Sequence, residues 1–297
     1  MDLNAVAAGL ATLALAGPAA GSGQAPPAPA RYAERYFESG GVRIRYVTRG
    51  DGLPVLLVHG FGVGAELNWV APGVLDSLAA RFRVIVPDLR GHGRSDKPHD
   101  VDAYGERFVT DLLGLLDHLG IERVDVVGYS FGSVITLKLL VDHPERVRRA
   151  VLGGAGWQPP GRRPPAWQAA WLEGLDRAGR ESTSVALALQ RTDVPAYPPQ
   201  LRAALDRNDP RALAAALRSR SRLAVSEAEL RASPVPILAL AGELDGEARA
   251  DIAALARVAA GVTVTVIPGA NHVSAVADPL FSKSITVFLT SPSGRQH

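Results

Sequence analysis

The stretch that most constrains the fold runs from Arg123 to Ile135, where an apolar, β-branched segment ends in Gly-Tyr-Ser-Phe-Gly and a helix-forming segment follows at once. This pattern predicts a strand, a tight turn and a helix, with Ser130 at the apex of the turn. The turn can close because Gly128 and Gly132 place no Cβ against the strand or the helix. The amino end of the helix then directs backbone N–H groups toward an oxyanion formed beside Ser130.

The pentapeptide alone does not establish a catalytic serine. Glycine makes up 30 of the 297 residues, so a Gly-x-Ser-x-Gly match arises easily by chance. An ordinary parallel sheet also contains glycine-rich turns between strand and helix. The function therefore has to be inferred from the other turns of the chain.

Seven further segments have the pattern of strands. Residues 32–38 and 42–48 alternate apolar and polar positions around Gly40-Gly41, which predicts an antiparallel pair at the edge of a sheet. The other strands are short apolar runs at residues 55–58, 82–86, 148–152, 235–241 and 262–267. Helical patterns alternate with them at residues 74–80, 105–119, 134–141, 248–259 and 279–289. We therefore predict an α/β fold with a mostly parallel eight-stranded sheet flanked by helices.

Residues 157–233 interrupt this alternation. They contain no strand-like run, carry Pro159-Pro160 and Pro164-Pro165, and are rich in Ala, Leu and Arg, which predicts a small helical insertion. We expect the insertion to form a cap over the strand ends, between core segments 31–156 and 234–297. Its arginines fit a solvated helix surface, and aromatic residues do not interleave with them, so we expect no nucleic-acid partner.

Residues 1–30 differ in composition from the rest of the chain. Residues 5–16 are apolar and helix-prone, and residues 17–30 are rich in Gly, Ala and Pro. The apolar run has the length of a signal-peptide core and is too short to span a bilayer, although the first four residues carry no Lys or Arg. We expect a leader outside the fold and an exported protein, periplasmic or secreted, with a cytoplasmic enzyme as the alternative.

Composition excludes several classes of function. A net charge of +2 is too small to imply nucleic acid or an anionic membrane as a partner. The absence of cysteine excludes a disulfide framework, a thiolate nucleophile and a cysteine metal site. Because His, Asp and Glu show no metal-ligand spacing either, we expect neither a metal nor an organic cofactor.

Two later turns supply the groups that a nucleophilic serine requires. Asp245 follows the predicted strand 235–241, and His272 follows the predicted strand 262–267. A serine hydroxyl is a poor nucleophile until a base removes its proton, and a neutral histidine suits that step at neutral pH. A carboxylate fixes the tautomer of such a histidine and stabilises its charged form. Serine, acid and histidine in this chain order are typical of α/β-hydrolases.

Residues 32–289 resemble the α/β-hydrolase family. The resemblance rests on five motifs, which are His59-Gly60-Phe61-Gly62, residues 88–95 (Asp-Leu-Arg-Gly-His-Gly-Arg-Ser), residues 128–132, Gly242-Glu243-Leu244-Asp245 and Asn271-His272. Five motifs in family order and spacing are far more specific than the serine turn alone. The resemblance implies a serine hydrolase of the esterase or lipase-like type with a short cap.

The resemblance also implies a role for individual residues. Ser130 is the implied nucleophile, Asp245 the acid and His272 the base. The implied oxyanion hole consists of the backbone N–H groups of Phe61 and Phe131. Substrate contacts are implied at Gly60, Trp69, Tyr129 and Trp157, and no metal is implied.

Other residues compete for these roles. Glu243 is a second carboxylate near the acid position, but the family pattern Gly-x-x-Asp favours Asp245. His59 and His92 also follow strands, and the resemblance makes them structural or pocket-lining rather than proton-transferring. We expect Asp88 to order the turn that follows it.

The favoured activity is hydrolysis of a small carboxylic ester through an acyl-enzyme on Ser130. The same triad serves carbon–carbon bond hydrolases of ring-cleavage products and cofactor-free perhydrolases, which are the alternatives. A receptor-like protein that only binds its ligand is a further alternative, from a different functional class. Epoxide hydrolases and haloalkane dehalogenases resemble residues 88–98, but they use an aspartate where Ser130 stands, so both are disfavoured.

Overall fold

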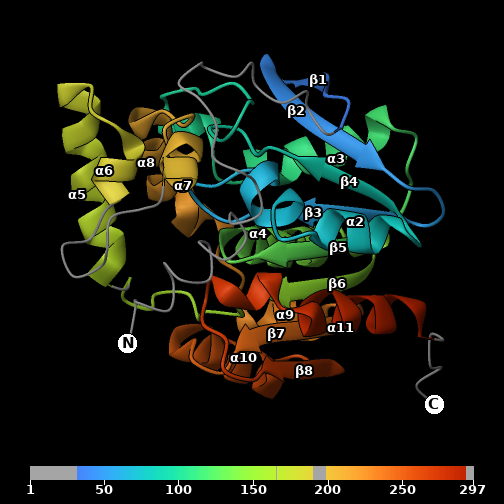
Figure 1. Cartoon of the computed structure of the whole chain (residues 1–297). Coiled ribbons are helices and arrows are strands. Elements are labelled where there is room, and N and C mark those ends of the chain that lie inside the picture. Colours follow the sequence, from blue (N-terminus) through green and yellow to red (C-terminus); the bar gives the residue numbers. More distant parts are fainter. Residues whose placement is uncertain (1–31, 165, 190–198, 292–297) are drawn as a thin grey trace.

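The computed structural model describes residues 32–164, 166–189 and 199–291 (Figure 1). The expected leader, residues 1–30, lies outside the described residues. None of the described helices has the length and apolar character of a bilayer-spanning segment.

An eight-stranded sheet forms the centre of the molecule, with the strand order β1-β2-β4-β3-β5-β6-β7-β8. The first two strands form an antiparallel pair at one edge, β2 also runs antiparallel to β4, and the remaining neighbours are parallel. The strands are β1 (Arg35–Ser39), β2 (Val42–Arg49), β3 (Pro54–Val58), β4 (Arg83–Pro87), β5 (Val124–Tyr129), β6 (Val147–Gly153), β7 (Ile237–Gly242) and β8 (Val262–Ile267). This topology confirms the predicted α/β fold with a mostly parallel eight-stranded sheet.

Helices cover both faces of the sheet. One face packs against α2 (Val74–Ala79) and α11 (Pro279–Thr290). The other packs against α3 (Arg107–His118), α4 (Phe131–Asp142) and α10 (Gly246–Val258). Short helical turns lie at η2 (Glu66–Val70), η3 (Val101–Ala103), η4 (Pro144–Arg146), η5 (Ser219–Leu223) and η6 (Ser274–Ala277).

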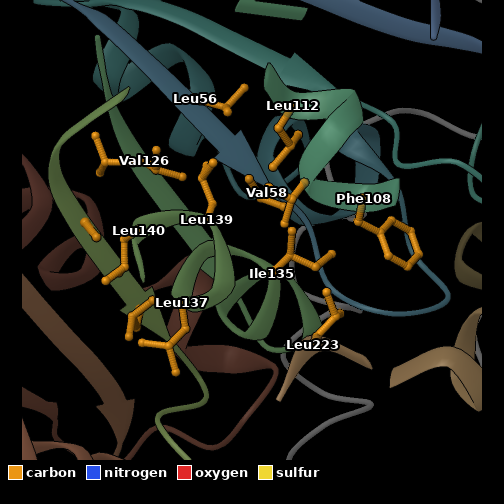
Figure 2. Packing of buried hydrophobic residues seen from close by; sticks show 14 of the residues in the cluster. Leu56, Val58, Phe108, Leu112, Val126, Ile135, Leu137, Leu139, Leu140 and Leu223 are labelled. Carbon is orange, nitrogen blue, oxygen red and sulfur yellow. The ribbon is translucent and has the colours of Figure 1, made fainter. Parts of the chain in front are cut away.

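Side chains along each strand point alternately to the two faces of the sheet. Leu56 and Val58 of β3 point into the layer beneath α3 and α4, where Figure 2 shows them beside Leu112 and Ile135. The intervening residues of β3 point to the opposite layer, because successive side chains of a strand alternate between faces. Each fully buried Leu, Ile or Val stabilises the fold by roughly 1.5–3 kcal/mol relative to an exposed one. The central strands are therefore apolar on both sides, which explains why they read as continuous hydrophobic runs.

Between β6 and β7 the described residues form helices and no strand. The helices are α5 (Ala166–Glu181), α6 (Val185–Leu189), α7 (Pro199–Leu205), α8 (Pro210–Arg218) and α9 (Glu227–Ala232), and α5 to α8 lie together at one end of the sheet in Figure 1. We call α5–α8 the cap helices. They share a small apolar cluster that includes Leu175, Leu213 and Leu217, and Phe61 and Val63 of the core pack against it. The cap helices therefore rest directly on the loop that follows β3.

The structure differs from the sequence-based expectation at the start of α4 and in an additional turn, η2. Helix α4 begins at Phe131 rather than at Val134, because Ser130 occupies its N-cap position and the helix starts immediately after the turn. The turn η2 was not predicted. It is a π-helical turn, in which the Ala71 N–H donates to the Glu66 carbonyl five residues earlier. Such turns insert one extra residue and re-aim the side chains around them.

Candidate active site

Ser130 lies on the strained turn that the sequence predicts between β5 and α4. Its backbone has φ 53° and ψ −115°, in a region that L-residues other than glycine rarely occupy. A Cβ on Gly132 would overlap the carbonyl oxygen of Val58, and a Cβ on Gly128 would lie 2.5 Å from Thr136 Oγ1. Both glycines are therefore required for the close packing of strand, turn and helix, which holds the serine hydroxyl clear of the backbone.

The structure brings Ser130, His272 and Asp245 together from three separate loops. His272 Nε2 lies 3.1 Å from Ser130 Oγ, and His272 Nδ1 lies 2.6 Å from Asp245 Oδ2. Asp245 is buried at the amino end of α10, whereas the His272 side chain is 47% exposed. The carboxylate thus holds Nδ1–H, which leaves Nε2 free to accept the serine proton.

Side-chain hydrogen bonds from His59 and Asn68 orient the backbone of Gly60, the residue before Phe61. His59 Nδ1 lies 2.8 Å from the Gly60 carbonyl oxygen, and the Leu89 N–H donates to His59 Nε2 at 2.9 Å. Because a backbone N–H can only donate, Nε2 is the acceptor and Nδ1 carries the proton given to Gly60. The Gly60 N–H in turn donates to Asn68 Oδ1 at 2.8 Å, so the peptides on both sides of Gly60 are oriented by side chains of the core.

The expected oxyanion donors flank this arrangement. Phe131 is the first residue of α4, so its N–H has no helical acceptor and lies at the positive end of the helix dipole. Gly60 packs against Ser130, since a Cβ on Gly60 would lie 3.3 Å from Ser130 Cβ. The rings of Phe61 and Phe131 meet edge to face with centroids 5.9 Å apart. The two amides thus belong to residues in mutual contact beside Ser130.

His59 and His92 lie inside the fold rather than in the group that contacts Ser130. Both are fully buried, and burial lowers the pKa of each, to about 3 for His92. His92 Nδ1 donates to the Arg90 carbonyl, and its ring lies edge-on to Phe61. Both rings therefore stay neutral at physiological pH, which fits the structural or pocket-lining role expected for them.

Asp88 organises the loops around it. Its carboxylate accepts hydrogen bonds from the N–H groups of Ala65 and Arg94 and lies 3.6 Å from the buried Arg45 guanidinium. A Cβ on Gly93 would lie 2.5 Å from Asp88 Oδ2, so this turn closes only around glycine. The contacts agree with the expected ordering role.

The expected substrate contacts divide into two groups. Gly60 and Tyr129 adjoin the triad, Gly60 against Ser130 and Tyr129 through a hydrogen bond from its hydroxyl to the His272 carbonyl oxygen. Trp69 is fully buried against Tyr129 and Phe281. Trp157 is 5% exposed and donates its indole N–H to the Val225 carbonyl. The two tryptophans are packing residues, which corrects the expectation that they line the substrate pocket.

A groove of about 380 Å³ lies between α5 and α8, away from the triad. Its lining residues are His99, Leu175, Asp176, Gly179, Arg180, Arg211, Ala214 and Arg218. Neither Ser130 nor His272 contributes to it. The groove is therefore a surface feature of the cap helices and not the space in which Ser130 would meet a substrate.

Sequence patterns did not single out two asparagines that contact the segment around Phe61. Asn68 lies in the unpredicted turn η2, and Asn208 precedes Asp209-Pro210, a pair that reads simply as the start of a helix. Trp171 of α5 stacks on Phe61 with centroids 5.7 Å apart. No local pattern predicts the contacts of Asn208 or Trp171, because each joins segments distant in the sequence.

Comparison with known proteins agrees with this geometry. A family model described as alpha/beta hydrolase fold matches residues 54–185, which contain Ser130 and the loop of Phe61 but not Asp245 or His272. Together with the sheet topology and the similar solved structures, this match shows that the chain has the α/β-hydrolase fold.

Two curated relatives are hydrolases from pseudomonads. The chain is 42% identical over 123 residues to a 2-hydroxymuconate semialdehyde hydrolase of Pseudomonas sp. strain CF600, which covers 41% of this chain and 43% of that protein. It is 43% identical over 123 residues to a 2-hydroxy-6-oxo-2,4-heptadienoate hydrolase of Pseudomonas putida, covering 41% and 44%. The chain thus spans less than half the length of the curated relatives that it matches.

Among solved structures, the chain is similar to a thermophilic esterase from Thermogutta terrifontis. The TM-score is 0.71 at 26% identity, over 86% of this chain and 98% of the esterase. The structural likeness therefore extends over a larger share of the chain than the similarity to the curated relatives.

Proposed function

We propose that this protein is a serine hydrolase in which Ser130 is the nucleophile, His272 the general base and Asp245 the orienting carboxylate. The single observation that carries the proposal is the chain of contacts from Ser130 Oγ to His272 Nε2 (3.1 Å) and from His272 Nδ1 to Asp245 Oδ2 (2.6 Å). The strained backbone at Ser130 supports it, because such strain concentrates at functional positions.

The proposed reaction begins with attack of Ser130 Oγ on a substrate carbonyl carbon while His272 Nε2 takes the hydroxyl proton. The N–H groups of Phe61 and Phe131 stabilise the negative charge that develops on the carbonyl oxygen. His272 then gives its proton to the leaving group, which departs and leaves an acyl group on Ser130. Water, deprotonated by the same histidine, releases the acid and restores the serine.

We propose carbon–carbon bond cleavage of ring-fission products as the first substrate class, in place of the ester hydrolysis favoured by the sequence. The support is the identity above 40% to two hydrolases named for such compounds. In these substrates, the bond beside the attacked carbonyl breaks and its electron pair passes into the conjugated keto acid as a dienolate. The leaving carbon then receives its proton from His272, so the triad serves without a further group.

Ester hydrolysis is the second candidate. Its support is the similarity to a thermophilic esterase over 86% of the chain. An ester differs only in its leaving group, an alkoxide that takes the same proton from His272. The two candidates therefore share every catalytic residue and differ in the substrate that the cap helices admit.

One experiment tests the proposal and separates the candidates. Purified wild type, Ser130→Ala and Ser133→Ala are assayed with 2-hydroxymuconate semialdehyde and with p-nitrophenyl esters from acetate to palmitate. We expect multiple turnovers by wild type, loss of roughly a millionfold in Ser130→Ala and most activity kept in Ser133→Ala, whose hydroxyl donates to the Gly153 carbonyl.

The substrate with the highest kcat/KM decides between the two candidates. Higher kcat/KM on the semialdehyde supports carbon–carbon hydrolysis, and higher kcat/KM on an ester supports the esterase. Equal rates in wild type and Ser130→Ala would refute the serine mechanism. A single turnover per molecule on every substrate would favour a receptor-like binding protein instead.

A further inference from the structure

The loop that carries Phe61 is held from two sides. On the core side, His59 and Asn68 fix the carbonyl and the N–H of Gly60, as described above. On the cap side, Asn208 Nδ2 donates a hydrogen bond of 2.8 Å to the Gly62 carbonyl oxygen. Phe61 therefore lies between one residue held by the core and one held by the cap helices.

Both the nitrogen and the oxygen of the Asn208 side-chain amide form hydrogen bonds. Nδ2 also donates to the Leu205 carbonyl at 3.1 Å, and Oδ1 accepts the Gly93 N–H at 2.7 Å. The residue is 6% exposed and lies between α7 and α8. A single buried cap residue thus joins the loop after β3 to the loop after β4.

Apolar contacts with the cap helices also hold the loop that carries Phe61. The Phe61 ring stacks on Trp171 of α5 with an interplanar angle of 20°. Gly62 has φ +71°, and a Cβ on it would lie 3.2 Å from Leu189 Cδ1. The loop has no room to shift toward the cap helices while these contacts are made.

We propose that Asn208 is a positioning residue for the oxyanion hole. By holding the Gly62 carbonyl, Asn208 sets the backbone on the far side of Phe61 and so places the Phe61 N–H that faces the developing charge. The position of the cap helices on the core thereby controls transition-state stabilisation at Ser130. It also shapes the space for the substrate. This inference rests on the proposed serine mechanism.

A purely structural role of Asn208 makes a different prediction. If Asn208 only fastened the cap helices, its loss would loosen substrate binding and raise KM. A displaced oxyanion donor instead lowers kcat with little change in KM, because the donor acts on charge that exists only in the transition state. The division between kcat and KM therefore separates the two roles.

The test uses Asn208→Asp, Asn208→Ala and the control His99→Ala. In Asn208→Asp, one carboxylate oxygen still accepts the Gly93 N–H, while the other faces the Gly62 carbonyl oxygen without a proton to donate. In Asn208→Ala, all three hydrogen bonds are lost without new repulsion. His99→Ala removes a different and exposed contact between core and cap, the 2.9 Å contact of His99 Nε2 with Asp209 Oδ2.

The readout is the second-order rate of labelling of Ser130 by a fluorophosphonate probe, whose phosphoryl oxygen occupies the oxyanion hole and whose use requires no knowledge of the substrate. We expect labelling to slow roughly ten- to hundredfold in both Asn208 variants, since loss of a whole oxyanion donor slows reaction about 10²–10³-fold. We expect His99→Ala to label within about twofold of wild type. Thermal unfolding checks that each variant is folded at the assay temperature.

Each outcome has one meaning. Slow labelling of the Asn208 variants with a normal control supports the inference, and a fall in kcat at unchanged KM on the best substrate supports it further. Wild-type labelling rates in either folded Asn208 variant would overturn it, as would equal slowing in His99→Ala, which would mean that any cap contact has this effect. If wild type itself is not labelled at Ser130, the serine mechanism has failed rather than the role of Asn208.

Discussion

The hydroxyl of Tyr129 donates a hydrogen bond of 2.5 Å to the backbone carbonyl of His272, a residue 143 positions away in the sequence. Tyr129 immediately precedes Ser130, the proposed nucleophile, and its ring lies 5.6 Å from the His272 ring, centroid to centroid. Burial raises the pKa of Tyr129, so its hydroxyl keeps the proton that it donates. The hydrogen bond thus joins the loop of His272 directly to the turn that carries Ser130.

Replacement of Tyr129 by Phe should lower kcat by roughly tenfold. The ring and its packing remain, but the loop of His272 loses the bond that fixes its distance from Ser130, and small misplacements of reacting groups slow catalysis strongly. Steady-state kinetics on the best substrate measure the effect. An unchanged kcat would show that the His272 loop holds its position without this bond.

Asp245→Asn should reduce kcat/KM by about 10⁴-fold with the fold intact. An amide nitrogen facing Nδ1 selects the wrong histidine tautomer and withdraws the charge that stabilises the imidazolium. Glu243→Gln is the matched control, because Glu243 is a carboxylate two residues away whose side chain accepts the Gly269 N–H. That control should retain activity within a few-fold, and loss of activity there instead would reassign the acid.

Acidification should destabilise the fold through the buried histidines. Burial lowers the pKa of His92 to about 3, whereas an unfolded histidine has a pKa near 6.5. Between these values the unfolded chain binds a proton that the folded chain does not, so the free energy of unfolding falls as pH falls. The slope is at most about 1.4 kcal/mol per pH unit for each histidine.

Urea unfolding of wild type and His92→Phe at pH 6.5, 5.5 and 4.5 measures this contribution. The variant should show a smaller pH slope, whatever its stability at neutral pH. Part of the slope should persist in the variant, because burial also lowers the pKa of His59. Identical slopes in the two proteins would mean that His92 is already protonated in the folded state.

The buried Arg90–Asp111 pair should be intolerant of losing one partner. Arg90 donates to both carboxylate oxygens at 2.5 and 2.6 Å and to the Ala103 carbonyl, and burial raises the pKa of Asp111 even beside this arginine. Asp111→Ala leaves an uncompensated buried charge and should lower the free energy of unfolding by about 3–5 kcal/mol.

The exposed pair of Arg231 and Glu227 is the control for that experiment. Both side chains are more than half exposed. Glu227→Ala should change the free energy of unfolding by about 1 kcal/mol or less, because solvent screens exposed ion pairs. Equal effects of the two substitutions in chemical denaturation would contradict the assignment of Asp111 to a low-dielectric environment.

The sheet and the three triad positions could be predicted because their signals are local. Each central strand is a short apolar run, and Ser130, Asp245 and His272 each follow such a run directly. Parallel strands bring their carboxyl ends to one edge of the sheet, so the order of motifs along the chain is enough to propose their meeting in space. The observed contacts among the three side chains agree with that proposal.

The contact that holds the loop of Phe61 could not be predicted, because its signal is not local. Asn208 lies 146 residues from Gly62, and the bond between them depends on how the cap helices sit on the core. The same limit explains why Trp69 and Trp157 were expected to contact the substrate although they are packing residues. An aromatic residue near a motif reads equally as a pocket wall or as core, and only packing shows that Trp69 is fully buried.

The backbone strain at Ser130 makes the proposed nucleophile also a position that lowers the stability of the fold. A left-handed conformation of this kind in a residue with a Cβ disfavours the folded state by about 1–3 kcal/mol, and glycine would relieve it. Under the proposed mechanism, selection for catalysis keeps a serine at this position. A descendant that retained the fold for another purpose would gain stability by drifting to glycine at this position, so the identity of residue 130 among future relatives marks which of them still catalyse.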